Sequence, residues 1–167
     1  MNESQLSRLA NDLTAELNEF LSLKAEIANA QSRLGTSTPD GFELRAVGSI
    51  LHDVYGGAEG ICQHIAKEID RRVPVGTNWH RDLLDQITQP LAKTRPAVLQ
   101  PETAGSLEKY RAFRHVFRNI YSPKLDWIQM KPLLDNATPT IDTFAADIEQ
   151  FMAFLRLMTG DDKGDES

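Results

Sequence analysis

Apolar side chains recur three or four residues apart along most of this chain, and no long run alternates apolar and polar positions as a strand does. Residues 4–34 form the first such stretch and contain no proline. Its apolar positions are Leu6, Leu9, Leu13, Leu17, Phe20, Leu21, Leu23, Ile27 and Leu34. Gly35 and the polar residues after it supply a helix stop and a turn. The pattern predicts one long amphipathic helix over residues 4–34.

A second amphipathic helix is predicted over residues 41–72. The apolar positions on its buried side are Leu44, Val47, Ile50, Leu51, Val54, Tyr55, Ala58, Ile61, Ile65 and Ile69. Three glycines, Gly56, Gly57 and Gly60, lie inside this helix, and each costs about 1 kcal/mol relative to alanine. We therefore expect a neighbouring helix to approach closely at these glycines.

The rest of the chain contains shorter helical patterns separated by turn residues. Thr77 or Asn78 is the expected N-cap of a third helix, and Pro90 is expected to bend or shorten that helix. The predicted elements are a helix over 79–94, a connector over 95–101, a helix over 102–121, a short turn or helix over 125–134 and a helix over 139–158. The apolar stripe of the last helix comprises Ile141, Phe144, Ile148, Phe151, Phe154, Leu155 and Met158. Together these patterns predict an all-α fold, an antiparallel bundle of about five helices.

Length and composition agree with one ordinary globular domain. The chain has 167 residues, of which 41% are hydrophobic and 25% charged, enough to bury a core without disulfides or metal ions. We expect a single domain over residues 1–159 and a disordered acidic tail over 160–167. No apolar run is long enough to cross a membrane, and the N-terminal residues do not resemble a signal peptide. We therefore expect a cytoplasmic protein with no membrane partner.

The single cysteine and the net charge limit the chemistry further. Cys62 has no second cysteine for a disulfide and lies in an apolar pattern, so we expect it to be a small buried residue. No spacing of His and Cys indicates a zinc site, and the sequence predicts no metal and no cofactor. The net charge of −6 argues against nucleic-acid binding by the whole surface but allows a local basic groove.

The cations of this acidic chain gather in residues 110–121, where three arginines and a histidine share one predicted helix with four aromatic residues. The aromatic side chains form a core-facing stripe and are Tyr110, Phe113, Phe117 and Tyr121. The basic side chains occupy its flanks and are Arg111, Arg114, His115 and Arg118. We expect these cations to be presented together, and the planar guanidinium of Arg114 suits phosphate binding. An ion pair with an acidic neighbour, or a solvated helix face, is the alternative role of Arg114.

Three segments of the chain resemble one known family. Residues 114–121, RHVFRNIY, are similar to the R-x4-H-x-Y signature of HepT-like toxins in the HEPN superfamily, and residues 125–127, LDW, match its usual continuation. Residues 51–59, LHDVYGGAE, and 78–84, NWHRDLL, resemble two earlier family segments. The motifs occur in the family's order, and the resemblance covers roughly residues 44–157.

The resemblance implies a HEPN-type bundle that forms a homodimer and cleaves RNA without a metal ion, in a cleft at the dimer interface. The catalytic positions that it implies are Arg114, Asn119 and Tyr121. It also implies that Arg111, Arg114, Arg118 and His115 bind the RNA phosphate. Tyr121 corresponds to a tyrosine that accepts AMP from the partner nucleotidyltransferase, an MNT-type antitoxin. His52 and His80 fall within the family segments, and we expect them to be structural hydrogen-bonding residues.

One position departs from the family signature, because Asn119 stands where the family has its histidine. An asparagine amide has no proton that ionises near neutral pH, so it cannot act as a general acid or base. Three explanations remain open: a naturally degenerate toxin, a site in which another residue replaces the histidine, or a substitution introduced so that a toxic ribonuclease can be expressed.

We therefore predict a HepT-like toxin of a toxin–antitoxin pair that binds RNA with little or no cleavage. The first alternative is a non-enzymatic HEPN module that binds RNA or a nucleotidyltransferase-like partner. The second is a helical interaction protein whose basic segment is only a surface feature.

Overall fold

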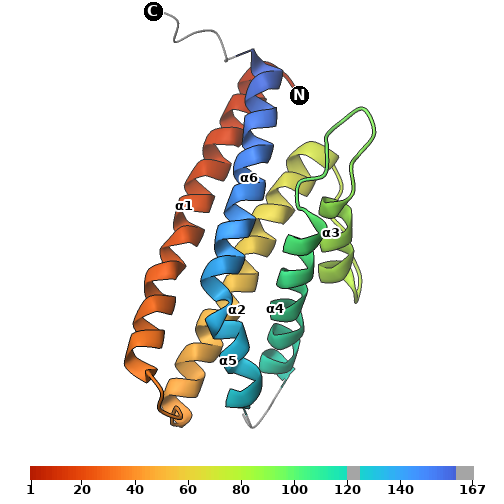
Figure 1. The fold of residues 1–167 in the computed structure, drawn as a ribbon. Coiled ribbons are helices and arrows are strands. Elements are labelled where there is room, and N and C mark those ends of the chain that lie inside the picture. Colours follow the sequence, from red (N-terminus) through yellow and green to blue (C-terminus); the bar gives the residue numbers. More distant parts are fainter. Residues whose placement is uncertain (120–124, 161–167) are drawn as a thin grey trace, which may run out of the picture.

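The computed structural model describes residues 1–119 and 125–160, without the side chain of Asn119. Within these ranges the fold is all-α, as predicted, with six α-helices and no strand (Figure 1). The helices are α1 (Glu3–Leu34), α2 (Gly41–Ile65), α3 (Trp79–Thr88), α4 (Pro101–Asn119), α5 (Trp127–Asp135) and α6 (Ala137–Thr159). The predicted short turn or helix over 125–134 is thus the helix α5. None of the described helices combines the length and the apolarity needed to span a membrane.

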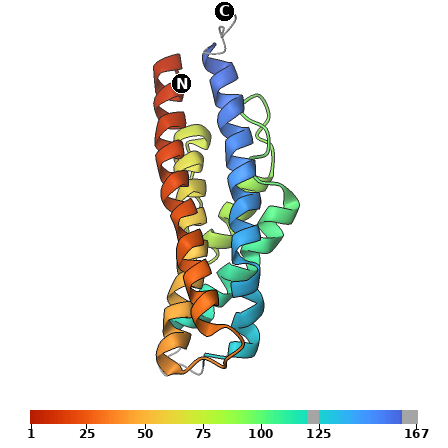
Figure 2. The ribbon, with the colours of Figure 1, turned by 60° about the vertical axis from the view of Figure 1, so that its left-hand side comes forward.

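The helices form an elongated antiparallel bundle with α2 at its centre (Figures 1 and 2). The two long helices α1 and α6 run side by side, and the described chain begins and ends at the same end of the bundle. The helix α2 packs against each of the other five helices, with α1 on one side and α3 and α4 on another. Residues on α2 can therefore meet residues from almost any part of the described chain.

The predicted apolar stripes form the core of the bundle. The buried residues of α1 include Leu9, Leu13 and Leu17, and Phe20 packs edge-to-face against Phe144 of α6, with ring centroids 5.3 Å apart. The prediction for Met158 was wrong, because its side chain is 57% exposed. Each residue of a helix is rotated by about 100° from the one before, so Met158 falls at the edge of the stripe and Thr159 takes the buried side.

The glycines of α2 differ in their surroundings. A Cβ at Gly57 would lie 2.5 Å from Cδ2 of Phe20, so the close approach of another helix is confirmed there. Gly48 makes a similar approach to α4, where a Cβ would lie 2.7 Å from Cε2 of Phe117. The prediction was wrong for Gly56 and Gly60, because a Cβ at either would meet no atom within 4 Å.

The corner between α2 and α3 departs from the predicted single helix over 41–72. The α-helix ends at Ile65 and continues as one π-helical segment, η1 (Ala66–Asp70), before Arg71 adopts a left-handed conformation with φ 56°. The next helix, α3, ends at Thr88 rather than at residue 94, because Pro90 has no N–H to continue the helical hydrogen bonds.

A buried ion pair fastens this corner to the connector that follows α3. Arg95 donates from Nε and Nη2 to the two carboxylate oxygens of Asp70, at 2.6 and 2.7 Å. Their side chains are only 1% and 4% exposed. Arg95 also donates to the backbone oxygens of Gln86 on α3, of Gln89 just after it and of Pro96. This pair holds α3 against α2, which positions the N-terminal residues of α3 beside the middle of α2.

Candidate functional site

The side chain of Arg114 lies in a polar cluster between α2, α3 and α4, and is 16% exposed. Its Nη1 donates to Oε1 of Glu59 at 2.9 Å, and its Nε donates to Nε2 of His52 at 3.3 Å. The guanidinium carbon also lies 5.6 Å from the ring centroid of Tyr55, within cation–π range. The arginine is therefore fixed from several sides rather than freely solvated.

Glu59 joins Arg114 to His80. Its side chain is 7% exposed, and its second oxygen, Oε2, is hydrogen-bonded to Nδ1 of His80. That Nδ1 also lies 3.3 Å from Nη1 of Arg114. An arginine nitrogen can only donate, and an ionised carboxylate can only accept, so Nδ1 must carry a proton that it donates to Glu59. The opposite nitrogen of His80, Nε2, then holds the lone pair when the ring is neutral.

His52 has the opposite arrangement. Its Nε2 accepts the hydrogen bond from Arg114 and so carries no proton, while its Nδ1 faces Oδ1 of Asp53 at 3.3 Å. The lone pair of His52 is therefore occupied by the arginine, whereas that of His80 is not. Both histidines therefore contact Arg114, but only His80 keeps a ring nitrogen whose lone pair can accept a proton from another molecule.

Two aromatic residues complete the cluster. The hydroxyl of Tyr55 lies 3.5 Å from the backbone oxygen of His80, and burial, followed by the nearby Glu59 carboxylate, raises the pKa of Tyr55 far above its ordinary value. Tyr55 therefore remains protonated and cannot act as a base at neutral pH. The ring of Trp79 packs on the ring of His80, with centroids 3.7 Å apart and an interplanar angle of 31°. This packing limits the orientations of the imidazole.

Local sequence explains how the cluster is built. His52, Tyr55 and Glu59 are three and four residues apart, so they lie on one face of α2. His80 is the second residue of α3, and Arg114 lies in the last turns of α4. The three segments that resembled family motifs, far apart in the sequence, therefore meet at Arg114.

Of the other predicted site residues, Arg111 lies close enough to Tyr55 and Glu59 of the cluster to interact electrostatically with both. Arg111 is paired with Glu108 on its own helix, through bonds of 2.7 and 2.6 Å, and this bond lowers the pKa of the Glu108 carboxyl. Arg118 and His115 are exposed on α4. Arg111 thus has a carboxylate partner on its own helix, and the joint presentation of these cations stays a prediction.

Two predicted positions fall outside this description. Asn119 is the last residue of α4, but its side chain is not among the described atoms, and Tyr121 lies outside the described residues. The predicted tail over 160–167 also lies outside them, apart from Gly160, which ends α6 with φ 68°.

Sequence reasoning missed Glu59 and Tyr55 as members of the cluster. The available signal was an acidic residue on the apolar face of a helix, since Glu59 lies between Ala58 and Cys62 on the buried side of α2. A carboxylate on such a face needs a cationic or hydrogen-bonding partner from another element. Which element supplied it was not visible in the sequence.

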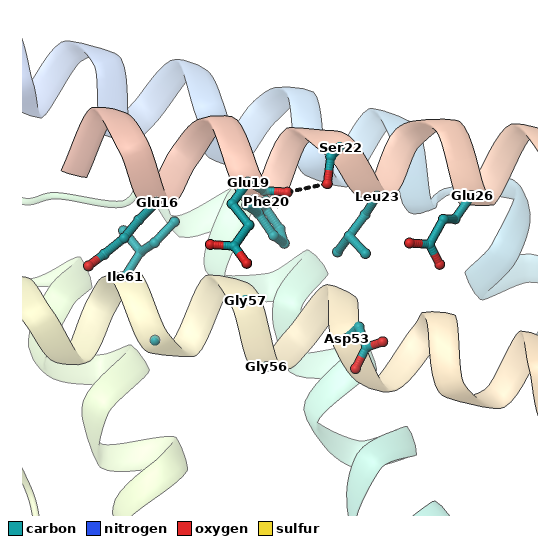
Figure 3. Close-up of a pocket in the computed structure, with 11 residues that line it drawn as sticks. Glu16, Glu19, Phe20, Ser22, Leu23, Glu26, Asp53, Gly56, Gly57 and Ile61 are labelled. Atoms are coloured by element: carbon teal, nitrogen blue, oxygen red, sulfur yellow. Dashed lines mark hydrogen bonds between the residues drawn. The ribbon is translucent and has the colours of Figure 1, made fainter. Parts of the chain in front are cut away.

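A groove of about 540 Å³ lies between α1 and α2, on the side of α2 that faces α1 (Figure 3). Its charged lining is acidic and comprises Glu16, Glu19, Glu26 and Asp53, while Gly56, Gly57 and Gly60 leave part of the α2 surface without side chains. This negative surface repels phosphate, so the groove is unsuited to nucleic acid. No group of three or more His, Cys, Asp or Glu in the described ranges is arranged to hold a metal ion.

The fold and the cluster define an all-α bundle with a buried carboxylate and two histidines around one arginine. A family model described as HepT-like protein matches residues 46–155, which is more than half of the chain and includes every residue of the cluster. The chain therefore belongs to the HepT-like family of the HEPN superfamily. The whole of α1 precedes the matched region. A search of curated proteins and a search of solved structures found no match.

Proposed function

We propose that this chain is the toxin of a toxin–antitoxin pair, with an RNA-binding site at Arg114 and a HEPN-type ribonuclease activity that is impaired by Asn119. One observation carries the proposal: three separate segments that resemble HepT-like motifs place His52, Glu59 and His80 around Arg114.

The geometry supports phosphate binding by Arg114. Its bonds to Glu59 and His52 use Nη1 and Nε, and no described residue accepts a bond from Nη2. A guanidinium edge that is held in place offers donors matched to phosphate oxygens. Arg118 lies one turn further along α4 and is exposed, so it is the auxiliary cation. Arg111 is the weaker candidate, because it must leave Glu108 before it can bind phosphate.

A homodimer is part of the proposal, because one helix alone gives a shallow site and apposed copies would exclude water from the phosphate. An apolar groove of about 710 Å³ between α4 and α5 supports it, lined among others by Phe113, Val116, Leu125 and Met130. Val116 is 48% exposed in the single chain.

In this proposal the second partner is a nucleotidyltransferase-type antitoxin, with Tyr121 as its AMP acceptor.

Impaired cleavage follows from the residue at position 119. Cleavage of RNA by its own 2′-hydroxyl needs a group that accepts the hydroxyl proton, and the asparagine amide does not titrate near neutral pH. General acid–base participation contributes about 10²- to 10⁴-fold to a rate. We therefore expect the present chain to bind RNA and to cleave it at least about a hundredfold more slowly than a chain with histidine at position 119.

A non-enzymatic HEPN module is the second candidate. The observation that favours it is the Arg114–Glu59 ion pair, because the carboxylate neutralises the arginine that would bind phosphate. In that case the chain would bind RNA or a nucleotidyltransferase-like partner without catalysis.

The test compares the present chain with Asn119→His. We expect the variant to cleave single-stranded RNA in the presence of EDTA and to inhibit growth on expression, and both effects should disappear when Arg114→Ala is added. Arg114→Ala should also weaken RNA binding and reduce its salt dependence. Binding with no cleavage by either the present chain or Asn119→His would favour the non-enzymatic module, and equal RNA binding by Arg114→Ala would place the RNA site elsewhere.

A further inference from the structure

We propose that His80, oriented by Glu59, is a catalytic residue of this chain, which accepts the proton of the RNA 2′-hydroxyl that Asn119 cannot accept. The inference rests on the proposed ribonuclease function and adds to it the group that carries out proton transfer. It predicts that the slow cleavage by the present chain depends on a residue of α3, outside the helix that carries the family signature.

Hydrogen bonding and ring packing fix the orientation of the His80 imidazole. The buried carboxylate of Glu59 accepts the proton on Nδ1 of His80, which leaves the lone pair of the neutral ring on Nε2. A carboxylate that orients an imidazole in this way is the arrangement by which a histidine serves as a general base. The ring of Trp79, packed on the imidazole, holds it in that orientation.

His80 also lies beside the proposed phosphate site. Nδ1 of His80 lies 3.3 Å from Nη1 of Arg114, so the imidazole is a direct neighbour of the guanidinium. The attacking 2′-hydroxyl belongs to the ribose that carries the scissile phosphate, so a phosphate on Arg114 brings that hydroxyl close to the ring. The side chain of His80 is 24% exposed, and no described residue hydrogen-bonds to its Nε2.

The other titratable groups are less suited to this step. The lone pair of His52 accepts a hydrogen bond from Arg114, and Tyr55 stays protonated. His64 is paired with Glu16 at 2.8 Å on the side of α2 that faces α1. His115 is exposed and lies about 100° around α4 from Arg114.

The step balances without a metal ion or a cofactor. Nε2 of His80 takes the proton of the 2′-hydroxyl as the 2′-oxygen forms a bond to phosphorus. The bond between phosphorus and the 5′-oxygen of the next nucleotide breaks, and that oxygen takes a proton from water. The products are a 2′,3′-cyclic phosphate and a 5′-hydroxyl, and the protonated imidazole returns its proton to solvent.

The experiment measures cleavage of a labelled single-stranded RNA of mixed sequence by the full chain in EDTA. His80→Gln should reduce the rate of the present chain at least about a hundredfold. His64→Gln is the matched control, because His64 is also paired with a glutamate and its side chain is 25% exposed, close to the 24% of His80. That control should leave the rate unchanged. Both variants should bind a non-cleavable 2′-O-methyl version of the RNA as tightly as the parent chain, which shows that they fold and that the loss lies in the chemistry.

Repeating the His80→Gln substitution in the Asn119→His variant distinguishes failure of this inference from failure of the proposed function. In Asn119→His a second imidazole is available to accept the proton, so His80→Gln should reduce the cleavage rate less there than in the present chain. Equal cleavage by the present chain and His80→Gln would overturn the role of His80 and leave the proposed function standing. The same holds if Asn119→His cleaves RNA while the present chain does not cleave at all. Absence of cleavage by both would overturn the ribonuclease function itself.

Discussion

Glu59 is a carboxylate on the buried face of a helix, and two partners make its position tolerable. Arg114 and His80 each donate to a different oxygen, so the carboxylate is satisfied although it is only 7% exposed. A buried charge becomes costly when one partner of such a group is removed, because the remaining charges lose their compensation. At the scale of single residues, Glu59 is therefore the residue on which the cluster depends.

Glu59→Gln is expected to lower the free energy of unfolding by about 3 kcal/mol, the low end for a broken buried ion pair, since Arg114 and His80 reach solvent in part. The matched change is Glu16→Gln, where the carboxylate is 39% exposed and paired with His64. That variant should lose less than about 1 kcal/mol. Urea unfolding followed by circular dichroism measures both losses. Equal losses would show that the buried carboxylate of Glu59 stabilises the fold no more than the partly exposed carboxylate of Glu16.

At the scale of elements, the face of α2 that meets α1 is shaped by its glycines. Gly57 lies against the ring of Phe20, which is buried at 4% exposure, whereas Gly60 faces open space in the acidic groove. Both glycines lie in one helix, so each destabilises the helix to a similar extent relative to alanine. Only at Gly57 is this loss offset, because the missing side chain lets Phe20 pack against α2.

Alanine substitutions at these two positions should therefore have opposite effects. Gly60→Ala is expected to stabilise the protein by about 0.5–1 kcal/mol, because helix propensity improves and no atom lies within 4 Å of the new Cβ. Gly57→Ala is expected to destabilise it by about 1–3 kcal/mol, because the new methyl group overlaps a buried ring. Thermal and urea unfolding provide the measurements. Stabilisation by both variants would mean that α1 can move away from α2 without cost.

At the scale of the whole molecule, buried tyrosine and cysteine side chains make the stability of the fold decrease at alkaline pH. Burial raises the pKa of Tyr55, of Tyr110 and of Cys62, the last to about 12 from an ordinary value of 9.0. A raised pKa in the folded state means that the fold favours the protonated group. Stability is then fully present below the ordinary pKa and is lost as the pH rises towards the folded value.

We expect the free energy of unfolding to fall above about pH 9, with Cys62 alone accounting for about 2 kcal/mol by pH 10.5. The check is a series of urea unfolding curves at pH 7, 9 and 10.5 for the parent chain and for Cys62→Ala. The variant should lose less stability over this range than the parent does. Parallel losses in the two proteins would remove Cys62 from the alkaline transition.

The local sequence determined most of the helices of this protein. Apolar spacing and the stop at Gly35 predicted α1 within one residue at its start, and spacing also located α2, α4 and α6. Periodicity and capping depend on residues within a few positions of one another, so one sequence is enough to read them. The match to the HepT-like family was visible for the same reason, since its motifs are short and continuous.

The partners of these residues were decided only by the tertiary structure. Nothing near Arg114 in the sequence indicates that Glu59 and His80 accompany it, or that Arg95 closes on Asp70. Likewise, three similar glycines of α2 differ because only one meets a ring from α1. Spacing shows which face a side chain occupies, but which element lies opposite that face is set by how the helices pack together. The polar cluster at Arg114 therefore exists only once α2, α3 and α4 have come together.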